Sequence, residues 1–235
     1  MKKLKLYLAA FTLICLTIPA LQSCMNDDNS NLRSYLTIGT LNIIEGREYY
    51  FDLDDGDKMY PGDTTHVHNY TLIDGQRAFI HFFPLEEDIP GYEYNAQIVE
   101  IENILTKPII PLTTATADSI GNDRINVINL WITNNFLNIE YQFFHSNNED
   151  KKHMLNLVIN ETPDAPSSEP DYINLEFRHN SYGDVQRKLF QGVVSFKLDE
   201  IAGQLNKKGL KILVNSIYDG KRTYTVEFNK GSSNT

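Results

Sequence analysis

Cysteine is scarce in this chain and confined to its N-terminus. Of 235 residues only Cys15 and Cys24 are cysteines, and both lie within the first 24 positions. The remaining sequence therefore has no disulfide, no thiolate nucleophile and no cysteine ligand for a metal. Basic residues are also few, with 21 Lys and Arg against 31 Asp and Glu and a formal net charge of −10. Such a chain repels phosphate backbones, so we expect no nucleic-acid partner.

Long hydrophobic runs are absent as well. The longest apolar stretch covers residues 6–18, follows a lysine-rich start and is followed directly by Pro19. A positively charged start and a short apolar run are typical of a signal peptide rather than of a membrane span. Residues 1–23 are therefore predicted to be a leader, and its removal makes the mature chain still more acidic.

The leader ends in a sequence that resembles a lipobox, the recognition site for lipid attachment. Leu21, Ser23 and Cys24 occupy the defining positions, whereas Gln22 is less usual between them. The resemblance implies that Cys24 becomes the first mature residue and carries several acyl chains, which anchor a protein stably. The alternative is an ordinary secretory signal that happens to precede a cysteine.

Residues 24–34 are polar and are predicted to form a flexible acidic tether. Asp27 and Asp28 follow the cysteine closely and resemble the acidic export signal of surface lipoproteins in Bacteroidetes. We therefore expect an outer-membrane protein that is lipid-anchored and faces the cell surface. A lipoprotein that faces the periplasm is the alternative.

Beyond the tether the sequence predicts two all-β domains. In residues 35–107, runs rich in β-branched and aromatic residues predict five strands and a small barrel of the OB type. These runs cover residues 35–44, 47–53, 70–73, 76–83 and 92–105. Asp74-Gly75 between two of them is a hairpin signal, because both residues tolerate the positive φ angles of a tight turn. Residues 108–122, which contain Pro108 and Pro111, are predicted to be a linker.

Residues 123–235 predict a second domain, an antiparallel β-sandwich. About seven strands with turn signals between them are typical of this fold. They are expected at residues 125–133, 136–144, 154–159, 172–178, 189–197, 210–218 and 223–228. One short helix is predicted over residues 199–205, with Asp199 near its N-terminus.

Several separate motifs, in the same order along the chain, resemble the NigD-like lipoproteins of Bacteroidetes. They are the Ser23-Cys24 signal end and residues 36–40 (LTIGT), 49–56 (YYFDLDDG), 131–132 (WI), 137–139 (LNI), 153–158 (HMLNLV), 175–180 (LEFRHN) and 183–184 (GD). The resemblance covers essentially the whole mature chain. It implies an N-terminal OB domain followed by a β-sandwich domain, and it implies neither a reaction nor shared catalytic residues.

The most polar cluster beside a predicted strand is Arg178-His179-Asn180 with Asp184. In a functional interpretation it forms a ligand-binding edge, where Arg178 binds a carboxylate and His179 or Asn180 donates to a sugar hydroxyl. In a structural interpretation Arg178 or His179 pairs with Asp184 across the turn, and Asn180 satisfies turn backbone. Side-chain bonds of the second kind are frequent at strand ends.

Other polar motifs favour no metal, no cofactor and no catalysis. Aligning Gly56 with the glycine of an EF-hand loop places Phe51 and Leu53 where acidic ligands are needed. His66 and His68 share one face only if they lie on a strand, and zinc requires at least a third protein ligand. The sequence also has no nucleophile elbow and no phosphate loop. We therefore expect a protein that is not an enzyme.

Two short motifs match the Asp-Ser/Thr-apolar pattern of O-glycosylation on exported Bacteroidetes proteins, which makes Thr64 and Ser119 candidate acceptors. The 12 Phe, 13 Tyr and one Trp are numerous enough to supply sugar-stacking platforms. Most of them alternate with polar residues along strands, which favours a place in two β cores. Taken together, the sequence predicts a non-catalytic module that binds another envelope protein, with surface glycan binding as the alternative.

Overall fold

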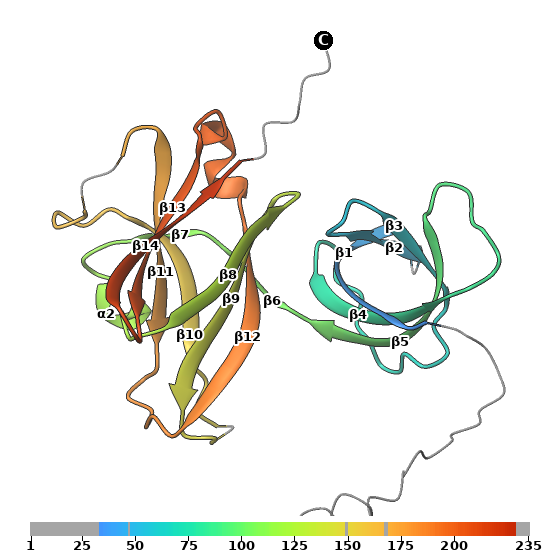
Figure 1. The fold of residues 1–235 in the computed structure, drawn as a ribbon, viewed down its shortest axis with the longest axis horizontal. Helices are drawn as coiled ribbons and strands as arrows, with labels where there is room; N and C mark the ends of the chain where they lie inside the picture. The colour runs from blue at the N-terminus through green and yellow to red at the C-terminus, as the bar shows by residue number, and fades with distance from the viewer. Residues whose placement is uncertain (1–32, 47, 149, 167–168, 229–235) are drawn as a thin grey trace, which may run out of the picture. The chain divides into compact units, whose positions relative to one another are not determined.

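The structure, a computed structural model, describes residues 33–46, 48–148, 150–166 and 169–228. The expected leader, the lipidation residue Cys24 and most of the expected tether lie outside these residues. Within them the chain is nearly all strand and forms a closed barrel followed by a sandwich of two sheets (Figure 1). None of the helices in this described part has the length and apolarity of a membrane span.

The barrel closes five strands in the order β1-β2-β3-β5-β4. They are β1 (Tyr35–Glu45), β2 (Glu48–Leu53), β3 (Lys58–Asp63), β4 (Arg77–Pro84) and β5 (Tyr94–Asn103). Side chains alternate across each strand, and the inward ones are fully buried, as at Leu41, Phe51, Met59, Ile80 and Ile98. The small OB-type barrel that the strand pattern predicts is confirmed.

The third strand of the barrel is β3 and not the predicted strand at residues 70–73, which pair with no other strand. β3 contains Pro61 and Gly62, two residues that normally indicate a turn. Here β3 pairs with β5 in an irregular register, and Gly62 lies directly against Asn95. A Cβ atom at position 62 would come within 2.0 Å of the Asn95 Oδ1 atom, so the glycine permits the close approach.

The sandwich packs a five-stranded sheet, in the order β14-β13-β11-β10-β7, on a four-stranded sheet, in the order β6-β12-β9-β8. Its elements are β6 (Leu105–Pro108), β7 (Ile110–Leu112), α2 (Ala117–Ile120), β8 (Asn126–Thr133), β9 (Phe136–His145), β10 (Met154–Asn160), β11 (Tyr172–Asn180), β12 (Lys188–Lys197), a 3₁₀ helix (Asp199–Gln204), β13 (Gly209–Ser216) and β14 (Gly220–Glu227). All seven strands predicted for this domain are present. The sandwich is mixed rather than purely antiparallel, because β6–β12, β7–β10 and β11–β13 are parallel pairs.

Residues 108–122, predicted to be a linker, belong to the sandwich instead. β6 pairs with β12 in one sheet and β7 pairs with β10 in the other, so the chain crosses between the sheets within a few residues. After β7, Ile120 of α2 packs with Leu112 and Val158 in a small buried cluster. Pro108 and Pro111 suggest a linker from sequence alone, but both lie on edge strands, where the missing N–H is tolerated.

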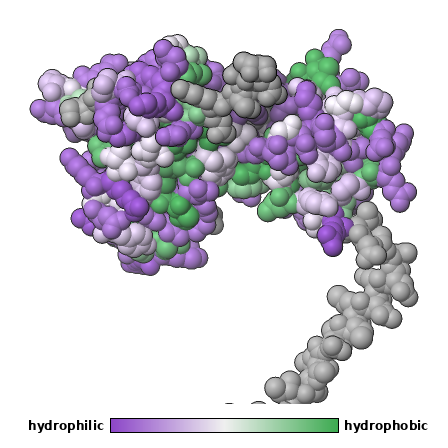
Figure 2. Space-filling view, turned by 45° about the horizontal axis from the view of Figure 1, so that its top comes forward, coloured by the Kyte–Doolittle hydropathy of each residue, from purple (hydrophilic) through white to green (hydrophobic). Residues whose placement is uncertain are grey.

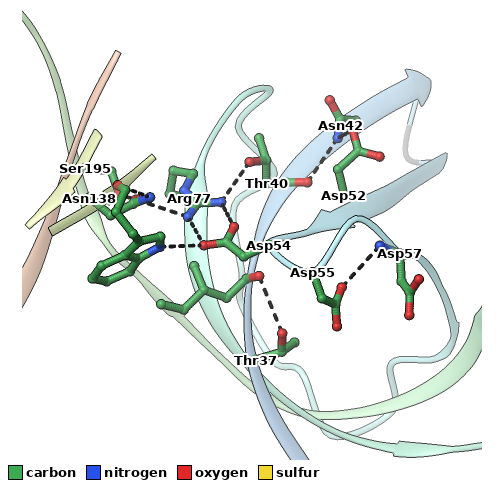
Figure 3. A network of polar contacts seen from close by, with 12 residues as sticks. Thr37, Thr40, Asn42, Asp52, Asp54, Asp55, Asp57, Arg77, Asn138 and Ser195 are labelled. Carbon is green, nitrogen blue, oxygen red and sulfur yellow. Dashed lines mark hydrogen bonds and ion pairs between the residues drawn. The ribbon is translucent and has the colours of Figure 1, made fainter. Parts of the chain in front are cut away.

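Hydrogen bonds to an ion pair of the barrel join the barrel to the sandwich (Figure 3). Arg77, the first residue of β4, is fully buried and donates two hydrogen bonds of 2.5 and 2.7 Å to the Asp54 carboxylate. Its guanidinium also donates to the Thr40 hydroxyl at 3.2 Å. From the sandwich, Asn138 Oδ1 accepts from the same guanidinium at 3.1 Å, and the Trp131 indole donates to Asp54 at 3.2 Å.

This junction explains why two polar residues on the outer face of a sheet have no contact with solvent. Asn138 and Ser195 alternate with core residues and point away from the inter-sheet core, yet both are fully buried. Ser195 donates to Asn138 Oδ1 at 2.7 Å, and the Phe136 ring lies 5.2 Å from the Arg77 guanidinium. Separating the domains would leave the Arg77 charge without part of its hydrogen bonding, which is costly in a buried setting.

We expect Arg77→Met to destabilise the protein by roughly 3 kcal/mol, because it leaves the Asp54 carboxylate without its main partner. Trp131→Phe removes only the indole donor and is expected to cost about 1 kcal/mol. Chemical denaturation followed by far-UV circular dichroism measures both. Trp131 is the one tryptophan of the chain, so its fluorescence in the Arg77→Met variant reports the junction directly.

The matched control is Arg222→Met, which breaks the exposed pair between Arg222 of β14 and Asp219 in the turn before it and is expected to change stability little. Equal stability losses for the Arg77 and Arg222 variants would contradict a structural role for the junction.

Candidate functional site

Strand β11 organises the polar side chains of the sandwich. It lies between β10 and β13, near the centre of its sheet. Alternation points Leu175, Phe177 and His179 towards the inter-sheet core and places Glu176 and Arg178 on the opposite, outer face. Arg178 and His179, neighbours in the predicted cluster, therefore lie on different sides of one sheet.

The outer face carries a groove of about 340 Å³, formed where the connection between β10 and β11 folds over the sheet. Its lining combines charged, amide and apolar side chains. The main contributors are Ile159, Asn160, Pro166, Glu169, Tyr172, Asn174, Glu176, Gln204, Lys207, Lys211 and Leu213. The volume lies at the lower end of the range for small-ligand sites.

Glu176 is the most buried acidic side chain of the groove, with 7% of its side chain exposed. Asn160 donates to one carboxylate oxygen at 2.6 Å, and Arg178 Nε donates to the other at 2.7 Å. Arg178 is itself only 17% exposed and forms an ion pair with the same carboxylate. Because both oxygens accept charge-assisted or amide hydrogen bonds, the position of the carboxylate is fixed.

Two lysines line the other end of the groove. Lys211 forms an ion pair with Glu169, and its Nζ atom lies 5.0 Å from the centroid of the Tyr172 ring. Lys207 donates to the Tyr172 carbonyl oxygen at 3.3 Å. The Asn174 amide donates to the Tyr172 and Glu169 carbonyl oxygens, both at 3.2 Å. These bonds hold the wall of the groove against the sheet.

A smaller hollow of about 90 Å³ shares Asn160 and Glu176 with the groove. It adds Arg178 and Lys221 as cations and Asp164 as an acid. Positive and negative side chains thus alternate along the outer face, and most of them already have a partner. Such an arrangement is complementary in charge to a polar surface that carries both signs.

On the inner face, His179 contacts His153, and His153 contacts Asp184. The two imidazoles are joined by a 2.8 Å contact between His179 Nε2 and His153 Nδ1. His153 Nε2 lies 3.2 Å from Asp184 Oδ2, and His179 Nδ1 lies 3.1 Å from the Arg124 carbonyl oxygen. The Phe143 ring stacks on both imidazoles, at centroid distances of 4.4 and 4.9 Å.

The protonation of this chain of contacts follows from its acceptors. Burial lowers the pKa of His179 to about 4, although the carbonyl of Arg124 opposes the shift, so the ring is neutral near pH 7. Its Nδ1–H donates to that carbonyl, and its Nε2 then accepts from His153 Nδ1–H. The Ser146 backbone N–H lowers the pKa of Asp184, which keeps the carboxylate ionised.

The remaining sequence candidates lie near the ends of elements. The Asn180 amide donates to the Ser119 carbonyl oxygen at 3.0 Å, and its oxygen accepts from the Tyr182 N–H at 2.8 Å. Ser119 is exposed on α2, where its hydroxyl donates to the Thr116 carbonyl oxygen at 2.9 Å. Thr64 is exposed and follows β3 directly. Asn180 thus ties the end of β11 to α2, and both predicted glycosylation acceptors lie on the surface.

The two halves of the chain match two domain families. Residues 38–104 match the NigD-like N-terminal OB domain, and residues 108–228 match the NigD-like C-terminal beta sandwich domain. The chain belongs to the NigD-like family. The family resemblance that the sequence motifs indicate is thereby confirmed, together with the order of the two domains.

Solved structures of similar proteins share the NigD-like fold. A protein of unknown function from Bacteroides vulgatus is 28% identical with a TM-score of 0.71, and the match covers 86% of this chain and 94% of that one. A putative toxin related protein from Parabacteroides distasonis is 27% identical with a TM-score of 0.66, covering 85% and 95%. A NigD-like immunity protein from Bacteroides caccae is 17% identical with a TM-score of 0.59, covering 86% and 95%, and shows the fold alone. No curated protein matches the chain.

Sequence reasoning missed His153 and Glu176, two residues that make several of the polar contacts in the sandwich. Glu176 has a signal in the sequence, because it is an acidic residue between Leu175 and Phe177 in a strongly apolar strand. His153 has none, since it lies in the segment before β10 and meets His179 only through the fold. His66 and His68, weighed as zinc ligands, are exposed in the loop after β3. In the described part of the chain, no three His, Cys, Asp or Glu side chains are placed to share a metal.

The lowered pKa of His179 makes the stability of the protein depend on pH. The unfolded chain binds a proton at this histidine near its ordinary pKa of about 6.5, whereas the folded chain binds it only near pH 4. Stability is therefore complete above pH 6.5 and is lost as the pH falls from 6.5 to 4, by about 3 kcal/mol. Denaturation across this range measures the effect.

The variant His179→Gln, which keeps a donor for the Arg124 carbonyl, is expected to flatten this pH dependence, and His66→Gln in the exposed loop is expected to leave it unchanged. An unaltered slope in the His179 variant would show that another group is responsible.

Proposed function

We propose that this NigD-like protein is a lipid-anchored protein of the outer membrane that faces the cell surface and binds another envelope protein without catalysing a reaction on it. The observation that carries the proposal is the groove on the outer face of the sandwich. It is preformed, its Glu176 side chain is held by Arg178 of the adjoining hollow, and charged side chains of both signs line it. A surface of this kind suits recognition of a protein segment that carries both charges.

Two further observations support binding rather than chemistry. The His153–His179–Asp184 contacts are buried, with side-chain exposures of 3% for His153 and 4% for Asp184, and all three residues are joined to other protein groups. In the groove, Glu176 accepts bonds from two donors.

Glycan binding is the second candidate function. Asn160, Asn174 and Gln204 contribute amides to the groove, and Tyr172 contributes an aromatic ring, as sugar sites commonly require. However, the Lys211 ammonium lies 5.0 Å from the centroid of the Tyr172 ring and occupies one of its faces. A sugar would have to displace this cation or use the remaining face, so the protein partner is favoured.

Co-purification of the tagged, lipidated chain from detergent-solubilised outer membranes tests the main proposal. One stoichiometric envelope protein is expected with the wild-type chain. Lys207→Glu reverses a charge that lines the groove and is expected to reduce recovery of the partner at least tenfold, as at a binding hot spot of about 1.4 kcal/mol or more. Lys208→Glu is the matched control, because Lys208 is exposed and pairs with Asp171 outside the groove.

Two outcomes would overturn this assignment. Recovery of the wild-type chain alone, together with a rise in melting temperature on addition of a sugar from a broad panel, would favour glycan binding. Equal reductions in partner recovery for Lys207→Glu and Lys208→Glu would show that the partner does not bind at the groove.

The proposed anchor has a separate test. Cys24→Ser removes the acylation site and is expected to shift the protein from the membrane pellet to the soluble fraction, because the acyl chains supply the membrane affinity. Incorporation of labelled palmitate into the wild-type chain and not into the variant measures lipidation directly. A variant that remains in the membrane pellet would show that Cys24 is not the anchor.

A further inference from the structure

Exposed apolar side chains by themselves do not mark a binding surface on this protein. On the face shown in Figure 2, hydrophobic residues form small patches among hydrophilic ones. Scattered exposure of this kind is ordinary. One of these patches differs from the rest because it lies at an unpaired strand edge of a sandwich sheet. Such an edge offers backbone hydrogen bonds as well as side chains.

Most edges of the sandwich carry features that discourage pairing with another chain. β6 and β7 are short, with four and three residues. β14 exposes the charged residues Lys221 and Arg222. β8 has a register shift between Val127 and Asn129, and such an irregularity twists an edge away from a partner.

The first half of β12 has one such feature, the exposed Lys188 at its first residue, and beyond it the strand is uncharged, regular in register and not short. The chain comes from the barrel into β6 at Leu105, and β6 pairs with β12 only from Val194 to Lys197 (Figure 1). Residues 188–193 consequently have no strand beside them on that side among the residues that the structure describes. Leu189 and Phe190 within this half are 39% and 41% exposed. Alternate residues of the edge present their backbone N–H and C=O groups outward.

An aromatic hollow of about 220 Å³ opens beside this edge. Phe190 forms one side of it, and its ring lies 5.3 Å from that of Phe143 and 5.8 Å from that of His145. His153 and Lys151 complete the lining together with two asparagines. The hollow has room for one large apolar side chain delivered by a strand that runs along β12.

Cations without an ion-pair partner among the described residues lie near the edge, although the whole chain carries a formal net charge of −10. Arg187 and Lys188 stand at the start of β12, and Lys151 lines the hollow. Of the acids nearby, Asp184 and Glu140 already accept hydrogen bonds from other protein groups, which leaves Asp150. The cations favour an acidic segment as the occupant.

We propose that the first half of β12 is a docking edge for an extended, acidic segment of a partner protein, which adds a strand to the sheet and inserts one apolar side chain into the hollow. Backbone groups repeated along an edge are complementary to another extended chain and to no other common ligand. The inference rests on the proposed function, since it names the part of the partner that binds and the edge that receives it.

The test places a photo-crosslinking residue at position 190 of the full-length chain, in the cells that make it. The matched control carries the same residue at position 128, because Ile128 is 44% exposed on the opposite edge of the same sheet. Position 190 is expected to crosslink to one linear segment of a partner, and position 128 is not. A synthetic peptide of that segment is then expected to bind the purified chain, and Phe190→Ala to weaken its binding at least tenfold. Ile128→Ala is expected to leave it unchanged.

Backbone methylation of the peptide separates strand addition from side-chain contact alone. In an added strand, every second N–H group points towards β12. Methylating that set of amide nitrogens is expected to abolish binding, whereas methylating the other set is not. Equal affinity of both methylated peptides and the parent peptide would overturn the proposal, as would crosslinks to a second copy of this chain. Failure to crosslink at position 190 while the partner still co-purifies would also overturn it and leave the proposed function standing. If no partner co-purifies at all, the proposed function and the docking edge both fail.

Discussion

The arrangement of the two domains depends on the polar contacts around Arg77 and Asp54, an ion pair of the barrel that also binds side chains of the sandwich. The guanidinium binds a carboxylate of its own barrel and an amide oxygen of the sandwich, while the Trp131 indole binds the same carboxylate from the other side. A buried charge with several partners resists separation because each lost bond leaves a desolvated group behind.

Within the sandwich, β11 separates two kinds of polar chemistry. Its inner face holds the neutral His179 among aromatic rings, beside the contact of His153 with Asp184. Its outer face holds Glu176 in the groove and Arg178 in the adjoining hollow, where the two side chains fix each other's positions. The strand alternation alone accounts for this division, since adjacent residues of one strand serve opposite faces of the sheet.

The sequence predicted the sandwich well because its strands alternate clearly, and each of the seven expected strands is found. It failed where tertiary contacts override local signals. Pro61 and Gly62 lie inside β3 because Gly62 must approach Asn95, and Ile110 and Leu112 form a strand because they bury against the sandwich. The candidate site was predicted in part. Asp184 does pair with a histidine of this region, but the partner is His153, whose position depends on the packing of Phe143 and His179.

The proposal that the sandwich is the binding surface of the protein has its most direct test in amide hydrogen exchange. Exchange is measured on the full chain, once purified alone and once in detergent-solubilised outer membranes. Binding through the sandwich predicts slower exchange in the outer-membrane sample along β11 and the first half of β12, with exchange along β8 unchanged. Protection confined to the barrel strands, or equal exchange of the sandwich in both samples, would contradict it.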